Sequence, residues 1–376
     1  MANIPPNASG VAIIGGGPGG LMLARLLQVS GIVATVFERD SHGDERPQGG
    51  SLDLHAGTGQ RAMRLAGLEQ AFLAAARPED QGDRLCDPAG TLLFDRDGLG
   101  DDRPEIDRTA LRRILLESLD PGTVHWGSKV ETIAPADGGG WQVVANGVAT
   151  TFDIIVGADG AWSRVRPLLS DAVPLYEGVT LVEFGFDTER HPQIDALVGS
   201  GKMFAVGDNR ALIGQRNGHG HIRGYTAQRM PENSARKLAE ATPEQVRATL
   251  LEAFAGWVPS LTCLIEQGDF IGVRQLHALP VGHRWASRPG LTLLGDAAHL
   301  MSPFGGEGVN LALADAADLA DALASGDGWA AVTRFEEAMA VRVTPAAQGA
   351  TKGLQSTISS AGVSPVLARY QRRVAA

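Results

Sequence analysis

Hydrophobic and polar residues follow two different patterns along this chain, and they predict two kinds of sheet. A continuous apolar run at residues 11–14 is typical of a strand buried on both faces, as in a parallel sheet. Residues 21–30 then place apolar side chains at helical spacing, and Gly31 follows as a natural C-terminal glycine. A second apolar run at 32–38 completes a strand–helix–strand unit at the start of the chain.

The middle of the chain alternates between apolar and polar residues, which predicts antiparallel strands with one face in a core. Such stretches occur at residues 178–186, 202–207 and 210–216. Residues 241–254 predict one helix among them. Its start has Thr242 as N-cap, Pro243 at the first helical position, and Gln245 completing a capping box.

Continuous apolar runs return within residues 152–157 and 290–294, and both predict further strands of the parallel kind. Residues 309–323 are rich in alanine and leucine, which suits a buried helix. Residues 328–343 predict a last helix, and Pro345, just after this stretch, is expected to be a kink or a break.

Composition narrows the class of protein. The 376 residues are 44% hydrophobic, enough for a sizeable core. A net charge of −10 argues against nucleic acid and anionic membrane surfaces as partners. No apolar run approaches the roughly 18 residues of a membrane span, and the N-terminal residues do not resemble a signal peptide. Cys86 and Cys263 are far apart, so we expect two reduced, buried thiols in a cytoplasmic protein.

The turn after the first strand carries a dinucleotide-binding fingerprint. Gly15, Gly17 and Gly20 form G-x-G-x-x-G between a strand and a helix, and Glu38 ends the next strand. The glycines allow a tight turn and close approach to a pyrophosphate, while the acid can bind ribose hydroxyl groups. The acid favours FAD or NAD(H) over a 2′-phosphorylated nucleotide, and the fingerprint alone does not choose between these two.

Two later apolar runs also end near an acidic residue. Asp159 and Gly160 follow the run at 152–157, with Ser163, Arg164 and Arg166 in the next turn. The run at 290–294 leads to Gly295 and is expected to end as a strand on Asp296. Open α/β sheets bind ligands at the carboxyl ends of their strands, so each acid is a candidate for cofactor binding.

Other possible motifs are weak. Residues 199–202 lack the leading glycine and the Ser or Thr of a P-loop. His219 and His221 have no carboxylate or cysteine nearby in the sequence, so we predict no metal site. A second dinucleotide fingerprint is absent from the sequence.

In this order, the three motifs resemble those of the single-component, class A FAD-dependent aromatic monooxygenases over nearly the whole chain. Residues 38–63 and 295–310 look closest to the tetracycline-inactivating monooxygenases of the TetX type. The resemblance implies an α/β fold: a glutathione reductase-type Rossmann domain for FAD, an inserted antiparallel-sheet substrate domain, and a C-terminal bracing helix. The implied FAD-binding parts are 1–72, 100–172 and 272–325, the substrate-binding parts are 73–99 and 173–271, and the helix is 328–376.

The same resemblance assigns cofactor-binding residues. For the pyrophosphate and adenosine it implies Gly15, Gly17, Pro18, Gly20, Glu38 and Arg39. For the flavin and its chain it implies Asp53, Arg108 (with Arg112 as a second possibility), Asp296, Pro303, Gly306, Gly308, Val309 and Asn310. Asp159 is expected near the pyrophosphate and the nicotinamide donor, NADPH or NADH, and Arg46 is a candidate for contact with the same donor. For Arg46 and Arg112, a solvated arginine is an equally simple interpretation.

The implied reaction is hydroxylation of an aromatic substrate with O2, through a flavin C4a-hydroperoxide. No side chain is assigned as a catalytic residue. The substrate-binding candidates are Phe184, Arg216, Arg223 and Phe304. For the three in the middle sheet, a core or surface role is equally plausible, with a surface salt bridge the simpler role for Arg223. A polycyclic phenol such as a tetracycline is the expected substrate of a monomeric enzyme, and a smaller phenol is the alternative.

Two other functions remain open from the sequence. One is a different flavoenzyme, such as a halogenase or a saturating reductase, although no W-x-W-x-I-P segment of tryptophan-type halogenases is present. The other is a protein that binds flavin or a drug without catalysis. Neither would yield an oxygenated product.

Overall fold

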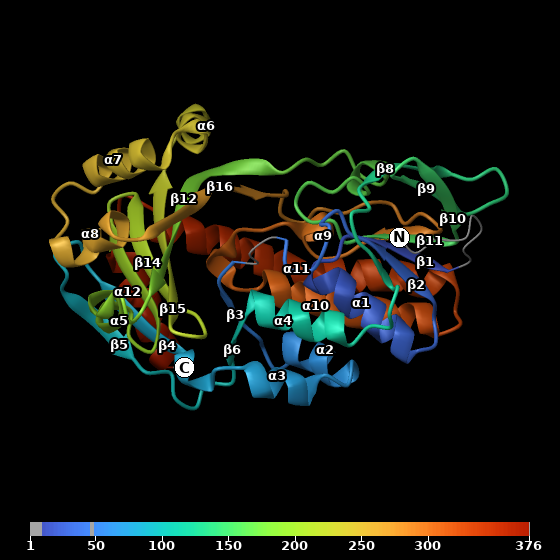
Figure 1. The fold of residues 1–376 in the computed structure, drawn as a ribbon, viewed down its shortest axis with the longest axis horizontal. Coiled ribbons are helices and arrows are strands. Elements are labelled where there is room, and N and C mark those ends of the chain that lie inside the picture. Colours follow the sequence, from blue (N-terminus) through green and yellow to red (C-terminus); the bar gives the residue numbers. More distant parts are fainter. Residues whose placement is uncertain (1–9, 46–48, 376) are drawn as a thin grey trace.

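The computed structural model describes residues 10–45 and 49–375. One half of the molecule is built on a five-stranded parallel sheet in the order β17-β11-β1-β2-β7 (Figure 1). Its strands are β1 (Val11–Ile14), β2 (Ala34–Phe37), β7 (Val124–His125), β11 (Ile154–Gly157) and β17 (Leu291–Leu293). The four apolar runs that predicted these strands therefore lie side by side, with Val11 paired to Ala34 and Ile154, and Ile155 paired to Leu291.

Helices α1 (Pro18–Val29) and α10 (Gly308–Ala324) pack against each other in this half. Helix α1 begins with Pro18 at its first position, where a missing backbone N–H costs nothing. Further helices are α2 (Gly59–Leu65), α3 (Glu69–Ala75) and α4 (Arg108–Glu117). Because α1 packs on both α10 and α4, residues from the two ends of the sequence share one hydrophobic core.

Two small sheets complete this half. Strands β8 (Val130–Pro135), β9 (Trp141–Ala145) and β10 (Val148–Phe152) form an antiparallel meander. Strands β3 (Ser51–Asp53) and β6 (Glu105–Asp107) pair antiparallel, with Leu52 opposite Ile106. The β3–β6 pair leads into the other half of the molecule.

The other half is a seven-stranded sheet in the order β16-β12-β15-β14-β13-β4-β5. Its pairs are antiparallel apart from β13 with β4, which confirms the antiparallel strands predicted from alternation. The strands are β4 (Gly82–Cys86), β5 (Leu92–Arg96), β12 (Leu175–Asp187), β13 (Gly201–Gly207), β14 (Arg210–Arg216), β15 (His221–Arg229) and β16 (Asp269–Ala278). Because β16 reaches Ala278, residues 272–278 lie in this sheet rather than in the FAD-binding part where we expected them.

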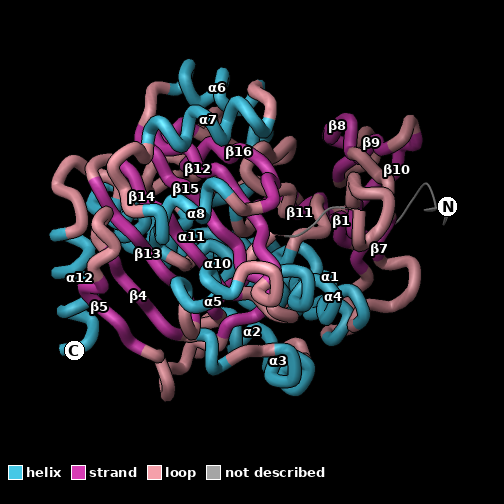
Figure 2. Tube along the Cα trace, turned by 60° about the vertical axis from the view of Figure 1, so that its left-hand side comes forward, coloured by secondary structure: helices cyan, strands magenta, loops and turns pink. Residues whose placement is uncertain are grey.

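Four helices cover one face of this sheet, which we call the outer face (Figure 2). Helix α7 (Pro243–Ala253) begins with the predicted capping box of Thr242 and Gln245. The other three are α5 (Pro192–Val198), α6 (Glu232–Glu240) and α8 (Pro259–Glu266). Their apolar side chains form a second core with Phe184, Phe186 and other side chains of the outer face.

The C-terminal helices pack on the opposite face of the sheet, which we call the inner face. Helix α11 (Trp329–Thr357) packs first in the core of the parallel sheet and then, through Leu354, against the inner face of the seven-stranded sheet. Helix α12 (Ser364–Ala375) follows as a separate helix, so two helices occur where one was expected. Pro345 lies inside α11, which continues through it, so the alternative of a break was wrong. No helix in the described ranges is long and apolar enough to cross a membrane.

Candidate active site

The glycine turn after β1 has the geometry of a phosphate-binding loop. Gly15 has a φ of 112°, and a Cβ there would lie 2.4 Å from the carbonyl oxygen of Ala158. A Cβ on Gly20 would lie 2.1 Å from the carbonyl oxygen of Gly15, so the helix packs closely on the turn. A Cβ on Gly17 would meet nothing within 4 Å. Gly15 and Gly20 are thus required by packing, whereas Gly17 leaves open space at the start of α1.

Glu38 and Arg112 hold this turn from the second strand and from α4. The Glu38 carboxylate accepts hydrogen bonds from the backbone N–H of Gly16 at 2.7 Å and of Asp40 at 3.0 Å. Arg112 is buried, and its guanidinium donates to the carbonyl oxygens of Gly16, at 3.4 Å, and Gly43. Arg112 is therefore not a solvated arginine, because its guanidinium is buried and binds backbone carbonyl groups at the glycine turn and at Gly43.

Arg108 lies elsewhere. Its backbone N–H donates to the carbonyl oxygen of Gly50 at 3.2 Å, and its side-chain stem lies 3.8 Å from the position of a Cβ on Gly49. Arg108 thus lies beside the loop before β3, and its contact with the cofactor stays a prediction. Arg39 is exposed beside the glycine turn, and Arg46 lies outside the described residues.

The second motif presents a buried carboxylate. The backbone N–H of Arg164 donates to Asp159 Oδ2 at 2.7 Å, whereas Asp159 Oδ1 is buried without a hydrogen-bond partner. Burial raises the pKa of Asp159, although hydrogen bonds from Ser163 and Arg164 oppose the rise. Arg166 donates to the carbonyl oxygens of Ala161, at 2.7 Å, and Ala297, at 3.0 Å, and so ties the second motif to the third.

In the third motif, the strand does not extend to the acid. Strand β17 ends at Leu293, and Gly295, with a φ of 58°, redirects the chain so that Asp296 begins the short helix α9 (Asp296–His299). The expectation that a strand ends on Asp296 was wrong, because the positive φ of Gly295 turns the backbone before the acid. The Asp296 side chain is exposed, so its carboxylate is accessible to a ligand.

Asp315, on α10, holds the turn at Gly295 in place. Its carboxylate accepts from the backbone N–H of Gly295 at 3.0 Å, from His299 Nε2 at 2.5 Å and from Arg342 at 2.8 Å. Burial opposes ionisation of Asp315, but the charges of His299 and Arg342 outweigh it and lower its pKa. No motif singled out Asp315, since its role depends on packing between α10 and the third motif.

The start of α10 exposes backbone beside Asp53. Pro303 and Phe304 lie in the short 3-10 helix η3 (Pro303–Gly305), and Gly306 follows with a φ of 69°. A Cβ on Gly306 would lie 3.7 Å from Asp53 Oδ1. Pro303 and Gly306 are exposed, and the first turn of α10 offers N–H groups of Gly308 and Val309 that no helical carbonyl can accept. This arrangement can bind the negative edge of a flat ring.

Asn310 has a different role from the one we expected. Its side-chain amide donates to the carbonyl oxygen of Asp53 at 2.8 Å and accepts from the backbone N–H of His55 at 2.8 Å. The side chain is completely buried. Its side chain thus clamps the segment after β3 to α10 and has no free hydrogen-bonding group for a cofactor, so only the backbone of Asn310 remains a candidate.

Charges from both halves of the molecule meet at Asp53. Burial opposes ionisation of Asp53, but Lys202 on the inner face and His55 outweigh it, and the pKa of Asp53 is lowered. His55 Nε2 lies 3.4 Å from Asp53, and His55 Nδ1 lies 3.4 Å from Glu307. Burial opposes protonation of His55, but these two carboxylates outweigh it and raise the pKa of His55 to about 9. His55 is therefore cationic at neutral pH.

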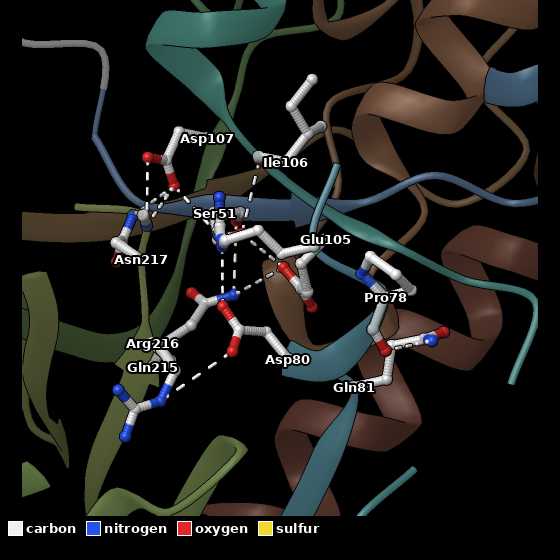
Figure 3. A network of polar contacts seen from close by, with 12 residues as sticks. Ser51, Pro78, Asp80, Gln81, Glu105, Ile106, Asp107, Gln215, Arg216 and Asn217 are labelled. Atoms are coloured by element: carbon white, nitrogen blue, oxygen red, sulfur yellow. Dashed lines mark hydrogen bonds and ion pairs between the residues drawn. The ribbon is translucent and has the colours of Figure 1, made fainter. Parts of the chain in front are cut away.

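A polar network joins β3 and β6 to the seven-stranded sheet (Figure 3). Glu105 accepts from the Ser51 hydroxyl at 2.6 Å and from Lys202 at 2.7 Å. Arg77 donates to Ser51 at 2.9 Å and lies 3.0 Å from Asp107. The sequence motifs did not reveal this network, which fixes the loop carrying Asp53 relative to the inner face.

The inner face carries a second charged group opposite the loop at Gly49 and Gly50, which precedes β3 and which we call the β3 loop. Glu183 is buried and pairs with Arg223 at 3.2 Å and with Arg274 at 2.6 Å. The hydroxyl of Tyr225 would lie 2.8 Å from a Cβ on Gly50, and burial together with Glu183 raises the pKa of Tyr225 to about 12. Arg223 and Tyr225 therefore lie where the two halves of the molecule face each other.

Two substrate-binding predictions are wrong in placement. Phe184 points to the outer face, where it packs on Phe270 and beneath Arg247 in the second core. Arg216 also lies on that side and pairs with Asp195 of α5 at 2.6 Å. Strand residues alternate between faces, so these two face the covering helices. Phe304, by contrast, packs with the inner-face cluster around Tyr225. Within the described ranges, no group of three His, Cys, Asp or Glu side chains could hold a metal ion.

These features fit FAD. The open space at Gly17 suits a pyrophosphate, and Glu38, the acid predicted for the ribose, accepts from the backbone N–H groups of Gly16 and Asp40. The exposed Asp296 and the bare backbone at Gly306–Gly308 suit the flavin chain and ring. The fit rests on backbone and carboxylates, the groups that a dinucleotide needs.

Comparisons with known proteins agree with this geometry. The family described as FAD binding domain matches residues 8–352. Monooxygenase asqM of Emericella nidulans is 34% identical over 371 residues, covering 83% of this chain and 83% of its own. The 3-amino-4-hydroxybenzoate 2-monooxygenase PtmB3 of Streptomyces platensis is 30% identical, covering 91% and 87%. The crystal structure of tetracycline destructase Tet(55) superposes with a TM-score of 0.76 at 20% identity, covering 97% and 94%, which shows a shared fold.

Proposed function

The chain belongs to the FAD-binding monooxygenase family, and from this premise we propose that it hydroxylates a phenolic, preferably polycyclic, aromatic compound with FAD, NAD(P)H and O2. We also propose that it acts as a cytoplasmic monomer. The observation that carries the proposal is the position of the bare α10 N-terminus and Asp53 opposite the polar inner face of the seven-stranded sheet.

This arrangement supports a ring-binding site with a different partner on each side. On one side, Pro303, Gly306 and the first N–H groups of α10 are open to a flat ring. On the other side, Arg223 and Tyr225 project from the inner face beside Gly50. A substrate between them would meet the cofactor ring on one side and hydrogen-bond donors on the other.

The substrate class follows from these donors and from the relatives. A protonated Tyr225 and an arginine can both donate to phenolate, carbonyl or carboxylate oxygens. The relative PtmB3 is named for a hydroxybenzoate substrate, which supports a phenol. The likeness to a tetracycline destructase is one of fold, so a tetracycline is one member of the class we propose to test.

Bound FAD, once reduced, would supply the activated oxygen for transfer to carbon. The residues of this chain bind and orient. Asp296 and Asp53 would hold the flavin chain and ring, and the α10 N-terminus would stabilise negative charge at the ring edge. Tyr225, whose pKa is raised to about 12, keeps its proton as a donor throughout the physiological pH range. Phe304 and the inner-face cluster exclude water from the reacting carbon.

Reduced nicotinamide nucleotide has no second fingerprint to bind. We propose a transient surface site near Asp159, which follows the strand β11 of the parallel sheet. Arg46 is the other candidate residue for binding the nicotinamide nucleotide, and its charge would favour NADPH over NADH through the 2′-phosphate.

The test measures NADPH and NADH oxidation by the purified, FAD-loaded protein with a panel of tetracyclines, polycyclic phenols and simple phenols. We expect one compound class to accelerate oxidation and to gain one oxygen atom by mass spectrometry. A slow rate that no compound changes, with peroxide as the sole product, would contradict the monooxygenase proposal and favour a non-oxygenating flavoprotein.

A further inference from the structure

The imidazole of His55 lies between two carboxylates at the start of α10. His55 Nε2 is 3.4 Å from Asp53 Oδ2, and His55 Nδ1 is 3.4 Å from Glu307 Oε2. A neutral imidazole has one N–H group and could donate to only one of these carboxylates, whereas an imidazolium donates from both nitrogens. Burial opposes protonation, but the two carboxylates outweigh it and raise the pKa of His55, in agreement with the charged state.

The backbone holds His55 in this position independently of its side chain. The backbone N–H of His55 donates to Asn310 Oδ1 at 2.8 Å, and the Asn310 amide donates to the carbonyl oxygen of Asp53 at 2.8 Å. Asn310 is completely buried, so this clamp is part of the core of the FAD-binding half. A replacement of the imidazole should therefore leave the segment after β3 in place.

Glu307 occupies the N-cap position of α10 but does not cap the helix. Among the described residues, its side chain accepts no hydrogen bond from the first turn of α10 and contacts His55 instead. A carboxylate bound at a helix N-terminus would neutralise part of the positive charge there. Because His55 binds the Glu307 carboxylate, the N–H groups of Gly308 and Val309 stay open to a ligand.

The charges around Asp53 depend on His55 for their balance. Lys202 also acts on Asp53, but its ammonium group lies 2.7 Å from Glu105, so two carboxylates share this cation. With His55 charged, the three carboxylates of this group exceed the two cations by one negative charge. With a neutral side chain at position 55, the excess would be two, beside the place where we expect the flavin ring.

A cavity of about 470 Å³ lies on another side of His55. The other charged side chains of its wall are Arg96, Asp101, Asp102 and Arg103, two cations and two anions. Arg96 pairs with Asp101. The cavity therefore adds no net charge, and through it the partly exposed imidazole can exchange its proton with water.

We propose that His55 is an electrostatic positioning residue of the flavin site. Its imidazolium neutralises Asp53 and Glu307, and so allows negative charge to form on a ring bound at Gly306 and Gly308. This inference rests on the proposed function, which supplies the ring at that place. A purely structural role for His55 would leave the relative affinity of the protein for oxidised and reduced FAD unchanged.

The test measures the midpoint potential of FAD bound to the purified protein, in the absence of O2, nicotinamide nucleotide and substrate. His55→Gln keeps hydrogen-bonding groups but removes the charge. We expect reduced FAD to lose about tenfold in affinity relative to oxidised FAD, because a nearby cation is lost. For a two-electron couple, a tenfold change lowers the potential by about 30 mV. An unchanged potential would overturn the proposal.

Glu307→Gln separates the effect of charge from the effect of structure. Both variants break the same contact, but this one removes a negative charge, so the potential should rise by a similar amount. The double variant His55→Gln/Glu307→Gln should return close to the wild-type potential. A fall in both single variants would show that the contact itself, and not its charge, matters, and would contradict the proposal.

Asp102→Asn is the matched control, because it removes an exposed carboxylate from the wall of the cavity that His55 also lines. Its potential should equal that of wild type. A rise as large as that in Glu307→Gln would indicate a general effect of surface charge and overturn the assignment to His55.

The pH dependence gives an independent readout. The pKa of His55 is raised to about 9, so the difference in potential between wild type and His55→Gln should be present at pH 7 and should close by pH 10. A difference that persists at pH 10 would contradict the role of the charge. Failure of the wild-type protein to bind FAD would contradict the proposed function itself, whereas bound FAD with equal potentials in all variants contradicts this inference alone.

Discussion

The two faces of the seven-stranded sheet use the same strands for different purposes. On the outer face, Phe184 packs into a closed core and Arg216 pairs with the covering helix α5. On the inner face, Arg223 and Tyr225 meet the β3 loop of the FAD-binding half, and Glu183 pairs with Arg223. Glu183 and Phe184 are neighbours in the sequence, yet one lies on the inner face and the other in the outer-face core.

The difference shows where selectivity can reside. The outer face is apolar and tightly packed, so changes there should alter stability. The inner face holds several charges that satisfy one another, so changes there should alter ligand recognition and its pH dependence. The predictions below separate these two effects, from the largest to the smallest.

The largest expected effect is a loss of stability from Phe184→Ala. Removing a fully buried aromatic ring from a core typically costs about 3–5 kcal/mol in the free energy of unfolding. Urea unfolding of the FAD-loaded protein measures it, and the KM for the aromatic substrate should stay unchanged in the folded variant. A raised KM with normal stability would move Phe184 to the substrate side and break the comparison.

A matched pair of arginines gives the next largest effect. Arg216 and Arg223 have similar exposed side-chain fractions of 22% and 18%, but they lie on opposite faces. Arg223→Ala should lower kcat/KM about 10–100-fold, because a hydrogen bond to a charged group contributes about 1.5–3 kcal/mol. Arg216→Ala should leave kcat/KM within about twofold. Steady-state kinetics with the identified substrate tests both, and equal losses would contradict the two-face assignment.

The third prediction concerns pH. The pKa of His55 is raised to about 9, so its contribution to stability is complete below pH 6.5 and lost as the pH rises through about 9. We expect a difference of at most about 1 kcal/mol in the free energy of unfolding, because its partners are partly exposed. Unfolding of wild type and His55→Gln is compared between pH 6.5 and 10. The two pH profiles should converge at high pH, and parallel profiles would remove His55 from the charge cluster at Asp53.

The smallest effect is expected from Tyr225→Phe. The hydroxyl lies beside the β3 loop and not in a closed core, so the free energy of unfolding should change by about 0.5 kcal/mol or less. The kcat/KM should fall a few-fold, because the substrate loses one donor. Kinetics at pH 7 and pH 9 should show the same ratio of variant to wild type, since the raised pKa keeps the hydroxyl protonated at both. A ratio that changes with pH would indicate that Tyr225 ionises in this range.

The sequence by itself determined the parts of this protein that depend on neighbours in the chain. The glycine turn after β1, the capping box of α7 and the parallel strands of the three motifs all follow from local spacing. Such features need only the backbone conformation of a few consecutive residues. The family resemblance added the order of the motifs and therefore the cofactor, which the family match supports.

The tertiary structure decided which side chains reach the site. Alternation along β12 and β14 shows that neighbouring residues point in opposite directions, but only the packing of α5–α8 makes the side of Phe184 and Arg216 the outer face. Asp315 and Lys202 were equally invisible as site residues, because each acts on segments distant in the sequence. Charge and burial are properties of the assembled fold, so the sequence predicted the cofactor loops but not the electrostatic surroundings that hold them.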